Sequence, residues 1–177
     1  MKRLILVRHG ETFQDKTDPE RVLTVKGIEN TIKLGRILKG LVSGKVVILC
    51  TNKKRAVESA KIIAKELGTG DIETADLRIQ NLELLKDLIE KNEKEGIRPA
   101  RTFLSLAKDQ LGNVESREDF ANRLAKIFDL RKEKTIIAVS HEASLEAFLY
   151  GQKKFGVVKK SFKKYFDYSD FALLVKA

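Results

Sequence analysis

Short apolar runs alternate along this chain with stretches in which apolar residues recur at three- and four-residue intervals. Runs of apolar and β-branched residues predict strands at 4–7, 45–50, 135–140 and 171–175, and a weaker strand is predicted at 72–77. The helical spacing predicts amphipathic helices at 24–41, 52–67, 82–89, 102–111, 116–128 and 142–149. Helix caps are predicted at Thr24, at Thr51-Asn52, and at Ser116 with Asp119 three residues later.

This alternation predicts an α/β fold in three layers, α/β/α, in which a largely parallel central sheet lies between two layers of helices. Such sheets bind ligands at the carboxyl ends of their strands. Arg8 and His9 follow the first strand, Asn52 and Arg55 follow the second, and His141 follows the strand at 135–140. We therefore expect both histidines of the chain and two arginines at one edge of the sheet.

Length and composition exclude several classes of protein. The 177 residues suit a single domain, 1–177. The longest apolar runs, 46–50 and 136–139, are far shorter than the roughly 20 residues that cross a bilayer, so no membrane insertion is expected. The apolar stretch near the start is interrupted at Arg8, too early for a signal peptide, which favours a cytoplasmic protein. With one cysteine, Cys50, and two histidines, neither a metal site nor a disulfide is expected.

The formal net charge of +10 has two readings. Of the 35 basic residues, 24 are lysines, which is typical of solvated faces carrying networks of ion pairs. Alternatively, a positive field concentrates anionic substrates or nucleic acid near the protein. Charge alone does not decide between the two readings.

The residues at the strand ends suit a tetrahedral dianion. Arginine offers paired donors and a permanent charge to phosphate oxygens, which is the role expected of Arg8 and Arg55. A neutral His9 would attack phosphorus as a covalent nucleophile, and Gly10 leaves room beside the phosphate. A protonated His141 would donate to a phosphate oxygen and stabilise the transition state. Each residue alone is more often structural, but their convergence on one edge predicts a site.

These residues resemble the motifs of the histidine phosphatase superfamily, which includes the phosphoglycerate mutases. Arg8-His9-Gly10-Glu11-Thr12 resembles the family's first histidine motif, and Val139-Ser140-His141 resembles the second. The segments at 23–27, 54–60 and 115–123 are similar to further family segments in the same order. The resemblance implies a phosphoglycerate mutase-like fold and a phosphatase that forms a phosphohistidine on His9. It also implies that Arg8, Arg55 and His141 hold the phosphate, with no metal or organic cofactor.

The chain departs from the family pattern at three positions. Asp15 replaces a common asparagine, and Glu142 follows the second histidine in place of glycine, adding negative charge near the anion. The family's acidic residue after the third strand aligns with Ile79, which leaves Glu83 as the nearest candidate general acid. An alkyl phosphate needs such an acid for its alkoxide leaving group, whereas a phosphoramidate needs it less.

Three functions follow from these departures. With Glu83 as the acid, the protein is a general phosphomonoesterase acting on a small phosphorylated substrate. Without an acid, a SixA-like phosphatase that removes phosphate from phosphohistidine in a phosphoprotein is the alternative. A third possibility is a regulatory module that binds phosphate without turnover. The family's mutases are similar but longer, so the length of this chain favours a phosphatase over a mutase.

A lysine-rich segment lies near the end of the chain. Six lysines between Lys153 and Lys164 are interleaved with Phe155, Val157, Val158 and Phe162. Basic residues near aromatic ones are compatible with nucleic acid, but no recognised nucleic-acid-binding motif is present, so nucleic acid is an unlikely partner. We expect the phenylalanines to turn into the core while the lysine stems cover the surface.

Overall fold

The computed structural model describes residues 2–13, 20–69, 71–162 and 166–176. Its strands form one six-stranded sheet in the order β3-β2-β4-β1-β6-β5. The strands are β1 (Arg3–Arg8), β2 (Val46–Cys50), β3 (Ile72–Thr74), β4 (Thr135–Ser140), β5 (Phe155–Lys160) and β6 (Phe171–Lys176). β1 to β4 run parallel, and β6 pairs antiparallel with both β1 and β5. The predicted α/β fold with a largely parallel sheet is confirmed.

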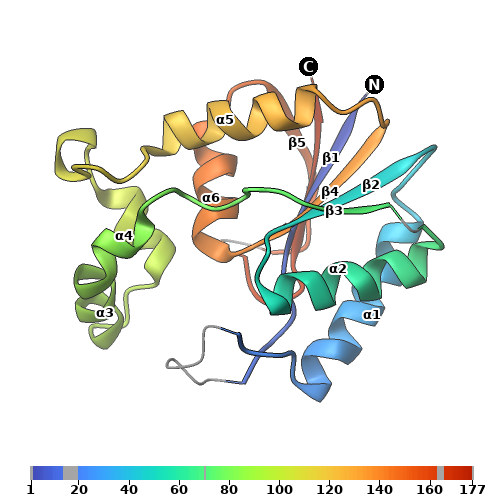
Figure 1. Cartoon of the computed structure of the whole chain (residues 1–177), viewed down its shortest axis with the longest axis horizontal. Helices are drawn as coiled ribbons and strands as arrows, with labels where there is room; N and C mark the ends of the chain where they lie inside the picture. The colour runs from blue at the N-terminus through green and yellow to red at the C-terminus, as the bar shows by residue number, and fades with distance from the viewer. Residues whose placement is uncertain (1, 14–19, 70, 163–165, 177) are drawn as a thin grey trace.

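Helices cover both faces of this sheet (Figure 1). They are α1 (Val25–Lys39), α2 (Lys54–Leu67), α3 (Lys86–Lys94), α4 (Pro99–Ser105), α5 (Arg117–Asp129) and α6 (Glu142–Gly151), with short 3-10 turns η1 (Leu82–Leu85) and η2 (Lys108–Gln110). α1 and α2 pack together on one face, and α5 and α6 on the other. In β1, Leu4 and Leu6 pack in the core with Phe120, whereas the alternate residue Ile5 packs with Leu34 on the opposite face.

The sheet order brings the ends of distant strands together. β4 lies between β1 and β2, with Arg8 paired to Ser140 and Cys50 paired to Val139. Just beyond the strands, the His9 amide donates to the Ser140 carbonyl at 3.1 Å, and the Thr51 amide donates to the Val139 carbonyl at 3.3 Å. Residues that follow the three strands therefore meet at one edge of the sheet.

Two predicted helix caps are confirmed and one is wrong. The Thr24 hydroxyl accepts a hydrogen bond from the Gly27 amide, and Ser116 accepts one from the Asp119 amide. The pair Thr51-Asn52 does not cap α2, because the helix begins after Lys53, which makes no side-chain capping bond. The Thr51 hydroxyl instead contacts His141.

Two predicted elements need correction. The single helix expected at 102–111 is two elements, because α4 already begins at Pro99 and ends at Ser105, before the separate turn η2. The lysine-rich segment contains the strand β5, which the sequence pattern did not predict. No helix in the described part of the chain is long and apolar enough to cross a membrane.

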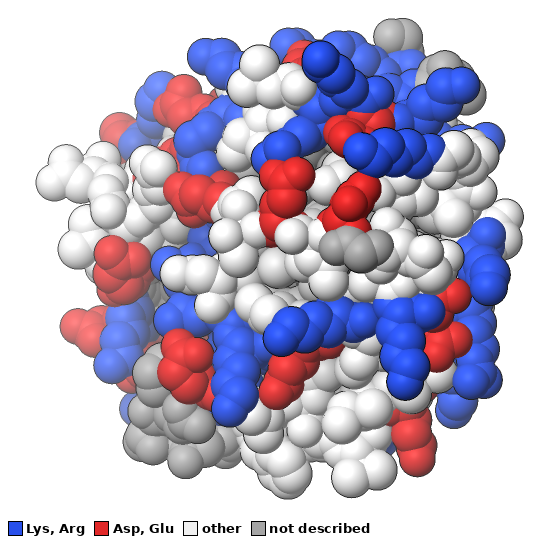
Figure 2. All heavy atoms as spheres, turned by 45° about the vertical axis from the view of Figure 1, so that its right-hand side comes forward, with Lys and Arg blue, Asp and Glu red and all other residues white. Residues whose placement is uncertain are grey.

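The aromatic residues of the lysine-rich segment turn inward as expected. Phe155 and Phe162 are buried, whereas the lysines at 153, 154, 159 and 160 are exposed; Lys163 and Lys164 lie outside the described residues. On the face shown in Figure 2, basic side chains extend across the surface with acidic ones between them. Several of these charges are paired, as in the 2.6 Å contact between Arg131 and Glu73.

Candidate active site

Two histidines face each other at the edge where β1 and β4 end. His9 follows β1 directly, and His141 is the residue between β4 and α6. Their ring centroids lie 5.1 Å apart in an edge-on arrangement. His9 is buried and His141 is partly buried, so both rings are largely shielded from bulk water. The structure thus brings together the two histidines that the sequence placed at one edge.

Arg55, in the first turn of α2, lies between the two imidazoles. Its Nε donates to Nε2 of His9 at 3.2 Å, and its Nη2 lies 3.5 Å from Nδ1 of His141. A guanidinium group only donates, so both of these ring nitrogens are acceptors. The positive charge of Arg55 is therefore directed at the space between the histidines, where an anion would lie.

The tautomer of His9 follows from its two contacts. Nδ1 lies 2.8 Å from the Gly10 carbonyl, which only accepts, so Nδ1 carries the proton and Nε2 keeps its lone pair. Burial, together with the charges of Arg55 and Arg8, lowers the pKa of His9 to about 3, although the Gly10 hydrogen bond partly opposes this shift. At neutral pH, His9 is a neutral imidazole whose free lone pair meets Arg55.

His141 is held in the matching tautomer. Nε2 lies 3.2 Å from the Thr51 hydroxyl, so with Nδ1 accepting from Arg55, Nε2 donates to Thr51. Burial lowers the pKa of His141 well below its ordinary value, and the nearby His9 and Arg55 lower it further. Thr51 was not expected in the site; its position directly after a buried strand was the only sequence signal.

Arg8 is fixed by contacts with loop and helix residues. Its Nη1 donates to the Phe166 carbonyl at 2.9 Å and lies 2.7 Å from Oε2 of Glu142. Its guanidinium group stacks 4.2 Å above the ring of Tyr168, which in turn lies 5.7 Å from the His9 ring. Tyr168 and Phe166 follow the lysine-rich segment, and no sequence pattern singled them out.

The carboxylate of Glu142 beside the anion site is paired with basic side chains. It is buried, and it pairs with Arg8 and with Nε of Arg98, the latter at 2.5 Å. Arg98 also donates to the Phe166 carbonyl at 2.7 Å. The two arginines thus offset the negative charge that was expected to weaken phosphate binding.

Gly10 lies where the loop after β1 crosses α1. A Cβ atom at this position would lie 2.6 Å from the Thr31 hydroxyl and 2.8 Å from the Gly27 carbonyl. The Gly10 amide donates to the Ser59 hydroxyl at 3.0 Å, which ties the loop to α2 near Arg55. Glycine is required here by close approach to the helix.

A cavity of about 530 Å³ opens over the two histidines. Arg8, His9, Arg55 and His141 line it, and so does Glu83 from the turn η1. Further lining residues are Thr12, Arg21, Arg78, Ile79, Leu82, Lys86, Ile89, Glu90, Glu93, Pro99, Glu142, Ala143, Ser144 and Tyr168. All the predicted side chains of the site therefore border one cavity, whereas Asp15 lies outside the described residues.

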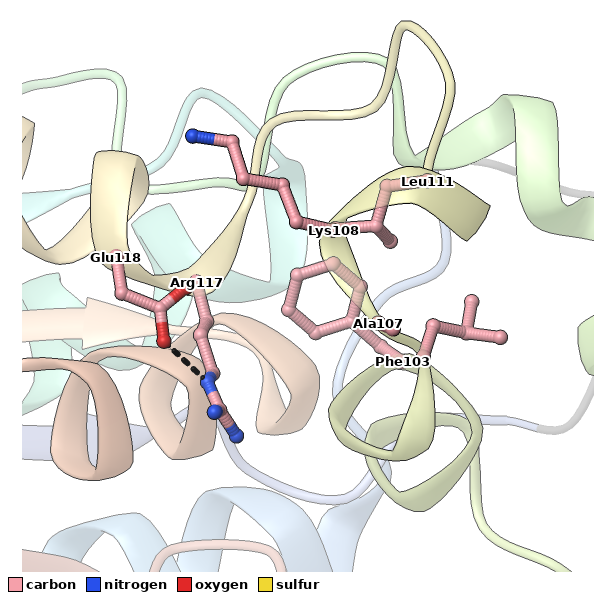
Figure 3. Close-up of a pocket in the computed structure, with 7 residues that line it drawn as sticks. Phe103, Ala107, Lys108, Leu111, Arg117 and Glu118 are labelled. Carbon is pink, nitrogen blue, oxygen red and sulfur yellow. Dashed lines mark hydrogen bonds and ion pairs between the residues drawn. The ribbon is translucent and has the colours of Figure 1, made fainter.

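Two other observations delimit this site. A separate hollow of about 320 Å³ lies between α4 and α5, where Phe103 and Leu111 face the ion pair of Arg117 with Glu118 (Figure 3). None of the predicted site residues lines that hollow. Among the residues that the structure describes, no cluster of histidine, cysteine, aspartate and glutamate could hold a metal ion.

Comparison with known proteins identifies a family. The sequence matches the family model described as the histidine phosphatase superfamily (branch 1) over residues 4–159. A search of curated proteins gave no match.

Solved structures share the fold at low sequence identity. A mycobacterial glucosyl-3-phosphoglycerate phosphatase with VO3 is 15% identical, with a TM-score of 0.57 over 84% of this chain and 79% of that chain. A putative α-ribazole-5'-P phosphatase from Escherichia coli is 21% identical, with a TM-score of 0.54 over 84% and 77%. A phosphoserine phosphatase from Entamoeba histolytica is 18% identical, with a TM-score of 0.54 over 85% and 79%.

Proposed function

Because the chain belongs to the histidine phosphatase superfamily, we propose that it is a phosphatase that hydrolyses phosphomonoesters through a phosphohistidine on His9. The observation that carries this proposal is the state of His9: a buried, neutral imidazole whose Nε2 lone pair meets Arg55 at the floor of the cavity. A neutral imidazole is nucleophilic, and the Gly10 hydrogen bond directs the reactive lone pair to Nε2.

In the first step, Nε2 of His9 attacks phosphorus in line with the leaving oxygen. The N–P bond forms as the P–O bond breaks, and the leaving alkoxide takes a proton. Arg55 turns from Nε2 to the phosphate oxygens, joined by Arg8 and by a protonated His141. In the second step, water attacks phosphorus and gives a proton back to the acid that protonated the leaving group. The N–P bond breaks, inorganic phosphate is released, and His9 is again a neutral imidazole. Positioning and charge supply most of the catalysis.

Glu83 is the proposed source of the leaving-group proton. Its carboxylate lines the cavity, and among the described residues no hydrogen bond or ion pair holds it elsewhere. Glu83 can therefore turn toward a leaving oxygen, as a general acid must. If Glu83 does not act in this way, the SixA-like alternative gains support, because phosphohistidine is a phosphoramidate.

Kinetics with two classes of ester test this function. Wild type is expected to hydrolyse ethyl phosphate and p-nitrophenyl phosphate, and His9→Ala to lose both activities. Glu83→Gln is expected to lower kcat for ethyl phosphate by about 10²–10⁴-fold, with less than tenfold loss for p-nitrophenyl phosphate, whose leaving group needs little protonation.

The matched control is Glu90→Gln, since Glu90 lines the same cavity but lies 3.8 Å from Lys86. This variant is expected to hydrolyse both esters nearly as wild type does. Equal losses on both esters in Glu83→Gln would refute the acid role. Saturable phosphate binding without hydrolysis of any ester would instead support a regulatory module.

A further inference from the structure

Arg78 lines the cavity beside the phosphate site, on a backbone that is fixed on both sides. Arg78 lies at a bend between the buried residues Leu77 and Ile79, and its own side chain is exposed. The Arg78 carbonyl accepts a hydrogen bond from Arg123 at 2.7 Å, and the Leu77 carbonyl accepts one from Ser140 at 2.7 Å. These bonds fix the backbone from which the Arg78 side chain reaches the cavity, where it also borders the neighbouring hollow beside Asn52 and Asp76.

Arg21 approaches the same cavity from another segment. It lies two residues before Leu23, which is buried, bridges to Thr12 and donates its amide to Glu58 at 3.0 Å. The Arg21 Nε atom is buried, yet it has no hydrogen-bond partner among the described residues. A buried guanidinium N–H without an acceptor is costly, and a ligand acceptor in the cavity would satisfy it.

The charges of these two arginines act on different histidines. The charge of Arg21 lowers the pKa of His9, and the charge of Arg78 lowers the pKa of His141. Both charges also lower the pKa of Arg55. Arg21 and Arg78 also line the cavity that opens over the two histidines, so a substrate held at the phosphate site shares that cavity with both arginines.

The pairing of charges in the cavity leaves both arginines available. Arg8 is paired with Glu142, and Arg55 would be occupied by the phosphate. On the wall formed by η1 and α3, Lys86 lies near Glu90, and Glu83 and Glu93 also border the cavity. Neither Arg21 nor Arg78 has a carboxylate partner within ion-pair distance among the described residues.

We propose that Arg21 and Arg78 bind a second anionic group of the substrate, so that the preferred substrates are small phosphomonoesters carrying a carboxylate or a second phosphate. This inference rests on the proposed function for its substrate, but the subsite itself can be measured without turnover. A cavity of about 530 Å³ is of the size that holds a small ligand. Arginine is suited to both anions because its paired donors match either group.

Matched ligands isolate the second anion. In a His9→Ala background, calorimetry compares the affinities for phosphonoacetate and ethylphosphonate. Phosphonoacetate carries a carboxylate where ethylphosphonate carries a methyl group. Phosphonoacetate is expected to bind at least about tenfold tighter, as charge-assisted hydrogen bonds to arginine predict. Adding Arg21→Gln or Arg78→Gln is expected to remove most of that preference. Arg36→Gln on α1, where Arg36 lies 3.2 Å from Glu66 outside the cavity, is the matched control and should preserve it.

Kinetics in the wild-type background give the second measurement. The ratio of kcat/KM for 2-phosphoglycolate to that for ethyl phosphate tests a carboxylate, and the ratio for propane-1,3-diol bisphosphate to propyl phosphate tests a second phosphate. At least one ratio should exceed about ten and fall toward one in both variants. Equal binding of the two phosphonates together with both kinetic ratios near one, or a preference that survives both substitutions, overturns the subsite. A binding preference without hydrolysis leaves the subsite standing and overturns the proposed function instead.

Discussion

The imidazoles of His9 and His141 lie with ring centroids 5.1 Å apart, and burial together with the charges of nearby guanidinium groups lowers the pKa of both. An incoming dianion reverses this effect at His141, because a negative charge within hydrogen-bond distance favours the protonated ring. The protonated Nδ1 can then donate to the anion in place of accepting from Arg55. The proton on His141 is thus expected to arrive with the ligand.

Sulfate binding measures this proton, because sulfate is a dianion that does not itself titrate near neutral pH. Calorimetry at pH 6 in buffers of different ionisation enthalpy is expected to reveal uptake of a large fraction of a proton by wild type. The uptake should persist in His9→Gln and disappear in His141→Gln. A binding enthalpy that does not depend on the buffer would contradict the proposed charge of His141.

Glu146, one turn after Glu142 on α6, carries a second buried carboxyl group. Burial, together with the charge of Glu142, raises the pKa of Glu146 to about 7, although the hydrogen bond from the Phe166 amide partly opposes this shift. The folded state therefore holds this proton more tightly than the unfolded state does. Its contribution to stability is complete below pH 4.5, the ordinary value, and is lost as the pH rises through 7.

Replacing this carboxyl with an amide removes the titration. From pH 4 to pH 8, the free energy of unfolding of Glu146→Gln should gain roughly 2–3 kcal/mol relative to wild type. Chemical denaturation at the two pH values measures the difference in unfolding free energy between variant and wild type. The control is Glu29→Gln, because Glu29 is exposed. A difference that does not change with pH would mean that Glu146 keeps its ordinary titration in the fold.

At the scale of elements, the crossing of the loop after β1 over α1 sets the position of His9. In Gly10→Ala, the added methyl group would meet the Thr31 hydroxyl and the Gly27 carbonyl, so the loop must shift. Such overpacking is expected to cost about 1–3 kcal/mol of stability and to displace His9, lowering kcat at least tenfold. Thermal unfolding and phosphatase kinetics measure the two effects.

Gly40→Ala supplies the control for this substitution, because a Cβ atom at Gly40 would meet its nearest neighbour at an ordinary 3.5 Å. That variant should keep wild-type activity. Full activity in Gly10→Ala would contradict the close approach described above.

Elements buried on both faces were the easiest to predict from sequence. β2 is apolar along its whole length, and β1 and β4 each have four consecutive apolar residues between polar ends, so these runs stand out from the surrounding polar residues. β5 escaped prediction because only Phe155 is buried in it and its register shifts at a bulge between Val157 and Lys159. An exposed edge strand lacks the apolar alternation from which strands are recognised.

The same contrast holds for the site. His9, Arg55 and His141 follow predicted strands, so their meeting at one edge could be inferred from the fold class. Tyr168 and the Phe166 carbonyl reach Arg8 from a loop near the end of the chain, and that contact arises only from tertiary packing. Thr51 was misassigned as a helix cap because a threonine before a helix has the same local signature whether it caps the helix or, as here, contacts a side chain from another strand end, His141.

At the scale of the whole molecule, the sheet order and the charge distribution have separate consequences. Placing β4 between β1 and β2 joins residues from both ends of the chain into one cavity. The net charge is +10, and on the face shown in Figure 2 acidic side chains lie between the basic ones. Lysines 159 and 160 lie on the edge strand β5, where charged side chains discourage pairing with another sheet.

Trapping the phosphoenzyme tests the central claim most directly. Wild type is incubated with p-nitrophenyl [³²P]phosphate and quenched in denaturant, and the labelled peptide is identified by mass spectrometry. We predict label that is labile in acid and stable in alkali, located on His9 and absent from His9→Ala. Hydrolysis of the ester by wild type without label on His9, or comparable turnover by His9→Ala, would contradict a phosphohistidine mechanism.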